Sequence, residues 1–129
     1  VMTGPGVPKG KRVEELVEIV DVMPTLLEMT GLPVPKGNQG LALMPLIEGA
    51  GGRDVIYMQG INNRTVRSAD AMYSIYMNGE ELLFDLQKDP HQLRNVATTA
   101  TALRDKMRHR LMLKVMQARD PLPERIRPY

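Results

Sequence analysis

The sequence has 129 residues, the length of one ordinary domain, and it contains no cysteine. Disulfide frameworks, thiolate zinc sites and cysteine nucleophiles are therefore excluded. About a quarter of the residues are Leu, Ile, Val or Phe, more than is typical of disordered chains, so a folded core is expected. No apolar run reaches the length of a membrane span.

The formal net charge is +2, but it is unevenly distributed. Residues 101–129 carry eight Lys or Arg against three Asp or Glu, while residues 1–100 carry nine against twelve. A basic segment of this kind is typical of a solvated helix face and, less often, of an anion-binding surface. Aromatic residues do not alternate with the basic ones, which argues against nucleic-acid binding by base stacking.

The amino-terminal part contains one clear helix signal. Val1–Thr3 looks like the end of a strand that runs into a turn. Residues 12–20 fit both helical and extended spacing, and the pattern does not decide between them. Asp21 can cap a helix that has Pro24 in its first turn, and Gly31 ends that helix.

Strands dominate the middle of the chain. Residues 41–47 are apolar but contain Pro45, so they form at most a short helical turn. Asn78-Gly79 predicts a two-residue hairpin turn with positive φ at both positions. We expect an antiparallel sheet of three or four strands: Asp54–Met58, Arg64–Arg67, Ala71–Met77 and Glu81–Leu86.

Helical signals return near the carboxy terminus. Asp89-Pro90 is typical of a cap and first residue of a single helical turn that passes Leu93 and ends near Asn95. The longest helix is expected over residues 101–117, because apolar residues recur there every four positions and would cover the sheet. These residues are Leu103, Met107, Leu111 and Val115.

The second half of that helix is apolar on nearly every side, because Met112, Leu113 and Met116 point away from the stripe. Two interpretations remain open. Either a partner surface covers these side chains, or the methionines fill an uneven core.

Residue chemistry alone reveals no active site. Ser68 and Ser74 have no histidine nearby in sequence to act as a base, and the glycines of 49–52 are not followed by the Lys-Ser/Thr of a phosphate loop. His91 and His109 stand apart, so a histidine metal site would need ligands from elsewhere.

A series of short motifs nevertheless resembles the carboxy-terminal third of the sulfatase family over residues 4–119. Each motif is weak, but their number and order are specific. The motifs are Gly4–Arg12, Val20–Leu27, Gly31–Pro33, Gly40–Leu46, Val66-Arg67-Ser68, Phe84-Asp85-Leu86, Asp89-Pro90 and Asn95-Val96-Ala97.

The resemblance implies a parent enzyme of the alkaline phosphatase superfamily that hydrolyses sulfate esters with a formylglycine nucleophile and a calcium or magnesium ion. The nucleophile motif Cys/Ser-x-Pro-x-Arg matches nothing in this chain, so no catalytic or metal residue is assigned and no cofactor is expected in the chain itself. Two departures weaken placement in a subfamily: Ala71-Met72 replace an aromatic and a lysine, and Phe84 replaces a tyrosine.

The fold class expected is α+β: a small antiparallel sheet covered by a carboxy-terminal helix and preceded by a helix and loops of the parent α/β domain. Residues 1–52 would be the end of the catalytic domain, residues 53–120 the carboxy-terminal subdomain, and residues 121–129 an irregular tail. The resemblance implies that the subdomain packs on the catalytic domain and helps to shape the substrate pocket.

The resemblance implies that the connection after the first small-domain strand approaches the substrate pocket, which makes its residues the best candidates in this chain for contact with a sulfated small molecule or glycan. Arg64 is suited to this because its planar fork pairs with sulfate or carboxylate. The candidates are Gln59, Asn62, Asn63 and Arg64. The competing interpretation is a solvated hairpin connection.

A second hypothesis is a free-standing, non-enzymatic module that self-associates or binds an acidic partner through the helix of residues 104–119. In both cases the chain alone is expected to be inactive. Without a parent domain, its apolar surfaces favour a homo-oligomer.

Overall fold

The protein is described by a computed structural model that covers residues 1–118 and divides into two compact units, residues 1–56 and the residues from 57 onward. The boundary predicted from the sequence lies at residue 52. The predicted tail, residues 121–129, lies outside the described residues. No helix within residues 1–118 has the length and apolar character needed to cross a bilayer.

The first unit contains short helices joined by loops. A single 3₁₀ turn, η1 (Ile19–Asp21), leads into α1 (Val22–Met29), and α2 (Leu43–Glu48) follows after a long loop. Residues 1–3, predicted as the end of a strand, form no strand here, because a strand needs a hydrogen-bonded neighbour and none lies within residues 1–55.

The ends of α1 show one correct and one wrong expectation. Gly31 ends the helix with φ of 71°, and the amide of Leu32 donates to the carbonyl of Leu27 at 2.9 Å, which satisfies a carbonyl of the last turn. Asp21 precedes the helix, but its side chain makes no capping hydrogen bond to the amides of α1. Its carboxylate binds Arg53 and the amides of Glu18 and Leu41 instead.

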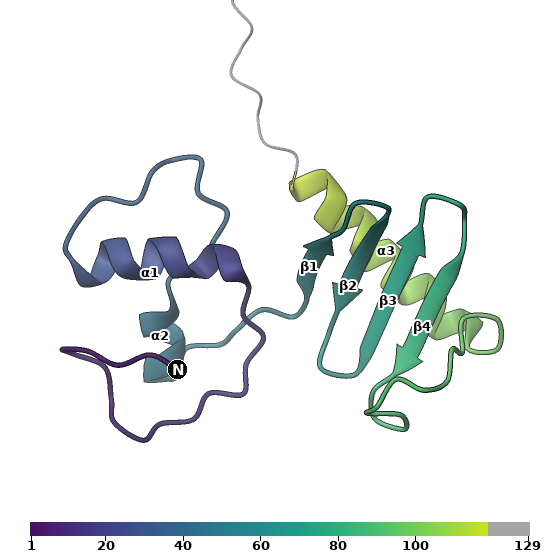
Figure 1. Cartoon of the computed structure of the whole chain (residues 1–129), viewed down its shortest axis with the longest axis horizontal. Coiled ribbons are helices and arrows are strands. Elements are labelled where there is room, and N and C mark those ends of the chain that lie inside the picture. Colours follow the sequence, from purple (N-terminus) through teal and green to yellow (C-terminus); the bar gives the residue numbers. More distant parts are fainter. Residues whose placement is uncertain (119–129) are drawn as a thin grey trace, which may run out of the picture. The chain divides into compact units, whose positions relative to one another are not determined.

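The second unit holds a four-stranded antiparallel sheet with the order β1-β2-β3-β4 (Figure 1). The strands are β1 (Ile56–Gln59), β2 (Asn63–Arg67), β3 (Ala71–Tyr76) and β4 (Glu81–Asp85). The register pairs Val66 with Tyr73 and Tyr73 with Leu83, and all three side chains are fully buried. This confirms the α+β fold predicted from the sequence.

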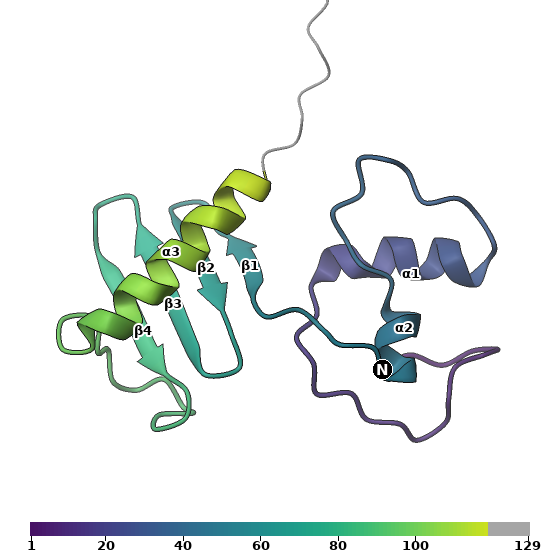
Figure 2. The ribbon, with the colours of Figure 1, turned by 180° about the vertical axis from the view of Figure 1, so that it is seen from behind.

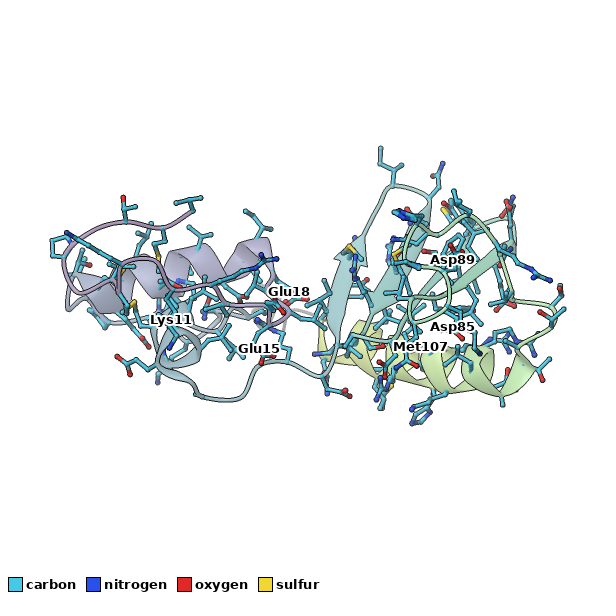
Figure 3. All side chains as sticks on the ribbon, turned by 90° about the horizontal axis from the view of Figure 1, so that it is seen from below. Lys11, Glu15, Glu18, Asp85, Asp89 and Met107 are labelled. Atoms are coloured by element: carbon cyan, nitrogen blue, oxygen red, sulfur yellow. The ribbon has the colours of Figure 1, made fainter. Side chains whose placement is uncertain are left out.

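One face of this sheet is covered by α3 (Thr101–Gln117), which lies across the strands in the view of Figure 2. Figure 3 shows Met107 on this helix, and both Met107 and Leu111 are buried. Leu103 and Val115 of the same stripe are half-buried, so the predicted stripe is confirmed. Met112, Leu113 and Met116 are exposed, as the all-round apolar pattern indicates.

The connection between β3 and β4 differs from the predicted two-residue turn. The amide of Gly79 donates to the carbonyl of Tyr76, and the amide of Tyr76 donates to the carbonyl of Glu80, which leaves a three-residue loop. Only Gly79 has positive φ, at 87°. This is a type I turn closed by a glycine bulge, which needs one left-handed residue rather than two.

Asp89-Pro90 does not begin a helical turn. The amide of Gln92 donates to the carbonyl of Asp89, which closes a single reverse turn, and Gln92 has φ of 57°. The carboxylate of Asp89 accepts from the amide of Arg94 at 2.8 Å. The side chain therefore stabilises an extended return of the chain rather than a helix.

That return covers the outer edge of β4. Asn95 mimics a neighbouring strand, because its Oδ1 accepts from the amide of Leu83 and its Nδ2 donates to the carbonyl of Glu81. The amide of Val96 then donates to the carbonyl of Leu83. These contacts satisfy the edge groups that would otherwise be open to another chain.

Candidate functional site

The predicted site is the loop that joins β1 to β2, at the end of the sheet where β3 and β4 are also connected (Figure 1). The amide of Gly60 donates to the carbonyl of Asn63 at 3.0 Å and closes the loop. The carbonyl of Asn62 accepts from the amide of Met77 at 2.9 Å and ties the loop to the β3–β4 connection. The loop backbone is therefore fixed at both ends.

Arg64 is held by this loop. Its Nη1 donates to the carbonyls of Gly60 and Asn63, both at 2.9 Å. Its Nε and Nη2 have no hydrogen-bond partner within residues 1–118, and the side chain is half-buried. Part of the guanidinium thus positions the group while the rest remains available to an anion.

None of the other three candidate side chains forms a hydrogen bond with the guanidinium. Asn63 precedes Arg64 on β2, so the two side chains leave on opposite faces of the sheet. The Nδ2 of Asn63 donates to Oγ1 of Thr65 at 3.1 Å. Gln59 accepts from the hydroxyl of Tyr57 at 3.2 Å, and Asn62 is exposed.

A Cβ at Gly60 would overlap Oδ1 of Asn63, so a side chain at this position would require the Asn63 amide to move. The side-chain amides of Gln59 and Asn62 are exposed, and Nε and Nη2 of Arg64 have no partner among the described residues. These groups are hydrogen-bond donors suited to an oxyanion. No group of three or more His, Cys, Asp or Glu side chains within residues 1–118 is arranged to hold a metal ion. The loop can therefore contact an anionic group, but it offers no nucleophile or metal.

Two ionic clusters escaped the sequence analysis because their members lie far apart in the chain. In the first, the hydroxyl of Tyr73 donates to Glu81, and Nη2 of Arg108 donates to the same carboxylate oxygen at 2.6 Å. These bonds from Tyr73 and Arg108 lower the pKa of Glu81. Burial, with the bond to Glu81, raises the pKa of Tyr73. The cluster joins α3 to the sheet.

The second cluster lies in the first unit, and its centre is the fully buried Asp21. Arg53 donates to both carboxylate oxygens, each at 2.5 Å, and also pairs with Glu18 at 3.1 Å. Burial alone would raise the pKa of Asp21, but the bonds from Arg53 and from the amides of Glu18 and Leu41 outweigh it and lower the pKa. This cluster joins α1 to the loops that follow.

A cavity of about 270 Å³ lies among the loops of the first unit. Its lining is mainly apolar and includes Val13, Leu43 and Leu46, with the charged side chains of Lys11 and Glu15 beside them (Figure 3). No set of polar groups converges there. The cavity therefore indicates incomplete packing of this unit rather than a reaction site.

Comparison with known proteins identifies a family over nearly the whole chain. The family described as N-sulphoglucosamine sulphohydrolase, C-terminal, matches residues 1–119. An arylsulfatase of Clostridium perfringens is 37% identical over 95 residues, which cover 68% of this chain and 20% of that protein. The chain spans about a fifth of the length of the curated relatives that it matches.

Solved structures share the fold. A phosphonate monoester hydrolase of Agrobacterium radiobacter superposes with a TM-score of 0.72 at 27% identity, over 84% of this chain and 26% of that one. A protein solved in complex with its substrate D-glucosamine-2-N,6-O-disulfate superposes with a TM-score of 0.68 at 22% identity, over 82% of this chain and 25% of that one.

Proposed function

This chain belongs to the sulfatase family, whose carboxy-terminal portion it represents, and we propose that it packs on a catalytic domain and helps to shape the pocket of a sulfuric ester hydrolase. The catalytic domain would supply the formylglycine and the calcium or magnesium ion. The proposed substrate class is a sulfated small molecule or glycan. By itself the chain is inactive under this proposal, because it offers neither nucleophile nor metal ligands.

The observation that carries the proposal is the family match over residues 1–119 together with the loop that holds Arg64. A guanidinium that is fixed by two carbonyls and keeps two nitrogens free is well suited to pair with a sulfate at the rim of a pocket. One protein of the same fold has a disulfated glucosamine as its substrate, which supports the substrate class.

The surface of the first unit supports the packing role. Apart from Val55, its buried residues are polar, small or proline, while large apolar side chains stay exposed. The exposed set includes Ile19, Leu26, Leu32 and Leu41. A unit that leaves such residues in water has little core of its own, which favours a covering domain.

A chimera tests the proposal. This chain would replace the aligned carboxy-terminal segment of the Clostridium perfringens arylsulfatase, and hydrolysis of 4-nitrophenyl sulfate would be measured. We expect turnover by the chimera. The Arg64→Met variant should raise KM about tenfold with a smaller change in kcat, because the lost contact holds the substrate rather than the reacting atoms.

The matched control is Arg94→Met, which removes an exposed arginine outside the β1–β2 loop and should leave KM unchanged. A folded chimera without turnover would contradict the packing role. An unchanged KM in Arg64→Met would contradict the contact of this loop with substrate. Because a related fold belongs to a phosphonate monoester hydrolase, a phenyl phosphonate ester is assayed in parallel to identify the preferred ester.

A further inference from the structure

The face of the sheet opposite α3 is not covered by any helix or strand of residues 57–118 (Figures 1 and 2). Tyr73 and Glu81 contact Arg108 of α3, so alternation along the strands places their neighbours on the other side, which we call the open face. On β2, β3 and β4 the open face consists of Asn63, Thr65, Arg67, Met72, Ser74, Tyr76, Leu82 and Phe84.

The centre of the open face is closed and satisfied. Thr65 and Ser74 pair across β2 and β3, both are buried, and their hydroxyl oxygens lie 2.7 Å apart. Asn63 donates to the same Thr65 hydroxyl. This row therefore needs no external partner.

The next row is different. The register places Arg67 opposite Met72, and Met72 opposite Phe84, so the row runs from one cation on β2 to two half-buried apolar side chains on β3 and β4. Nε of Arg67 is buried and has no hydrogen-bond partner. The guanidinium makes no hydrogen bond or ion pair with any residue of 1–118, whereas those of Arg53 and Arg108 are paired with carboxylates.

A buried guanidinium nitrogen without an acceptor is costly, because water no longer solvates it and no protein group replaces the water. The planar fork of arginine fits a carboxylate through two parallel hydrogen bonds. The missing component of this row is therefore an anionic acceptor, and the adjoining Met72 and Phe84 favour an acceptor carried next to apolar groups.

A second copy of the chain does not fit this requirement. None of the residues on the open face is acidic, so face-to-face pairing would bury two unpaired arginines. A sulfated sugar fits poorly as well, because its hydroxyls and sulfate need several donors and Arg67 is the one cation among the residues of this face.

We propose that the open face docks an acidic segment of polypeptide, which places an Asp or Glu carboxylate on Arg67 and an apolar side chain on Met72 and Phe84. The acidic and apolar character of the partner is inferred from the residues of this face alone. The inference rests on the proposed function only in naming a catalytic domain as the natural source of such a segment.

The test follows the Nε–Hε signal of Arg67 in the ¹⁵N-labelled full chain by NMR. The probe is a capped peptide of alternating Leu and Glu, compared with the matched Leu and Gln peptide. We expect the chemical shift of the Arg67 Nε–Hε signal to change saturably as the Glu peptide is added. The Gln peptide should bind about tenfold more weakly, because it cannot form the ionic bidentate contact.

Two variants test whether the difference between the two peptides depends on Arg67. Arg67→Met should abolish the difference between the two peptides, and Arg94→Met should preserve it. If the chemical shift of the wild-type Arg67 signal does not change at millimolar Glu peptide, the proposal is overturned, even if Arg67→Met fails to fold. Equal movement with sodium sulfate or a sulfated disaccharide would also overturn it and would identify a sulfate site instead.

These results are separable from the chimera assay. An inactive chimera with a responding Arg67 signal would contradict the enzymatic proposal and leave the docking surface in place. An active chimera whose Arg67 signal does not shift with the Glu peptide would support the enzymatic proposal and contradict the docking surface.

Discussion

Asp21 is the residue on which the first unit depends most strongly. It is fully buried, accepts two hydrogen bonds from Arg53 and two from backbone amides, and joins α1 to residues 41 and 53. Thr25 extends the network, because its hydroxyl donates to the carbonyl of Asp21 and accepts from the amide of Leu43. A short stretch of helix and loops is thus held by polar contacts rather than by a core.

Replacing Asp21 by Asn should lower the free energy of unfolding of this unit by about 2 kcal/mol, because it removes the carboxylate that accepts two hydrogen bonds from Arg53 and leaves Glu18 as the remaining charge partner. Urea titration followed by the NMR signals of α1 measures this. Asp85→Asn is the control, since Asp85 pairs with the highly exposed Lys88 and its loss should not shift the midpoint. Equal midpoints for wild type and Asp21→Asn would contradict the role of the cluster.

The same network predicts a pH dependence. The pKa of Asp21 is lowered in the folded state, so its carboxylate stabilises the fold fully above the unfolded pKa of about 3.9 and progressively less as the pH falls toward the lowered value. The stability gap between wild type and Asp21→Asn should therefore be widest near neutral pH and close in acid. A gap that widens below pH 4 would show the sign to be wrong.

At the scale of elements, the β3–β4 connection is set by the backbone of Gly79. Its φ of 87° lies in the left-handed region, and a Cβ there would meet no atom within 4 Å, so only backbone strain opposes a side chain. Gly79→Val should cost more than about 1 kcal/mol, and Gly79→Asn clearly less, because Asn tolerates this region. Thermal unfolding followed by circular dichroism compares the two. Identical melting temperatures would exclude the observed bulge.

The contact between α3 and the sheet depends on Glu81 and Arg108 in addition to the buried stripe. A double-mutant cycle of Glu81→Gln and Arg108→Met should show a coupling of about 1 kcal/mol, modest because Arg108 is half-exposed. Stability is read from urea unfolding of the sheet signals. Strict additivity of the two changes would mean that the ion pair does not hold the helix.

At the scale of the whole molecule, the exposed side chains of Met112, Leu113 and Met116 lead us to expect self-association of the chain when no catalytic domain covers them. Each large side chain that becomes buried contributes roughly 1.5–3 kcal/mol. Sedimentation velocity over a dilution series should show a concentration-dependent dimer, and Met112→Glu combined with Met116→Glu should abolish it. Lys106→Gln, on an exposed position of the same helix, should not. A wild-type monomer at every concentration would contradict the expectation.

The isolated chain is also expected not to hydrolyse 4-nitrophenyl sulfate and not to bind calcium tightly. No nucleophile motif of the family is present in its sequence, and residues 1–118 contain no cluster of metal ligands. Turnover of the purified chain above a buffer blank, or a calorimetric calcium titration with micromolar affinity, would contradict this assignment of the chemistry to a catalytic domain.

Local signals in the sequence determined the elements of this protein. The periodicity of hydrophobic residues predicted most strand ends to within one or two residues, and it predicted the long helix over residues 101–117. It could do so because each pattern reflects contacts between residues close in sequence. The order of short motifs determined the family. The same local signals were wrong at Asn78-Gly79 and Asp89-Pro90, where neighbouring segments selected one turn among several that the residues allow.

Only the tertiary structure decided which polar side chains meet. Asp21 and Arg53 are 32 residues apart and Glu81 and Arg108 are 27 apart, and no periodicity links residues at such separations. The four predicted site residues lie between positions 59 and 64, yet strand alternation separated Asn63 from Arg64. The proposal for Arg67 depends on the tertiary structure for the same reason: the register places Met72, and no carboxylate, opposite Arg67, and its Nε is buried without an acceptor.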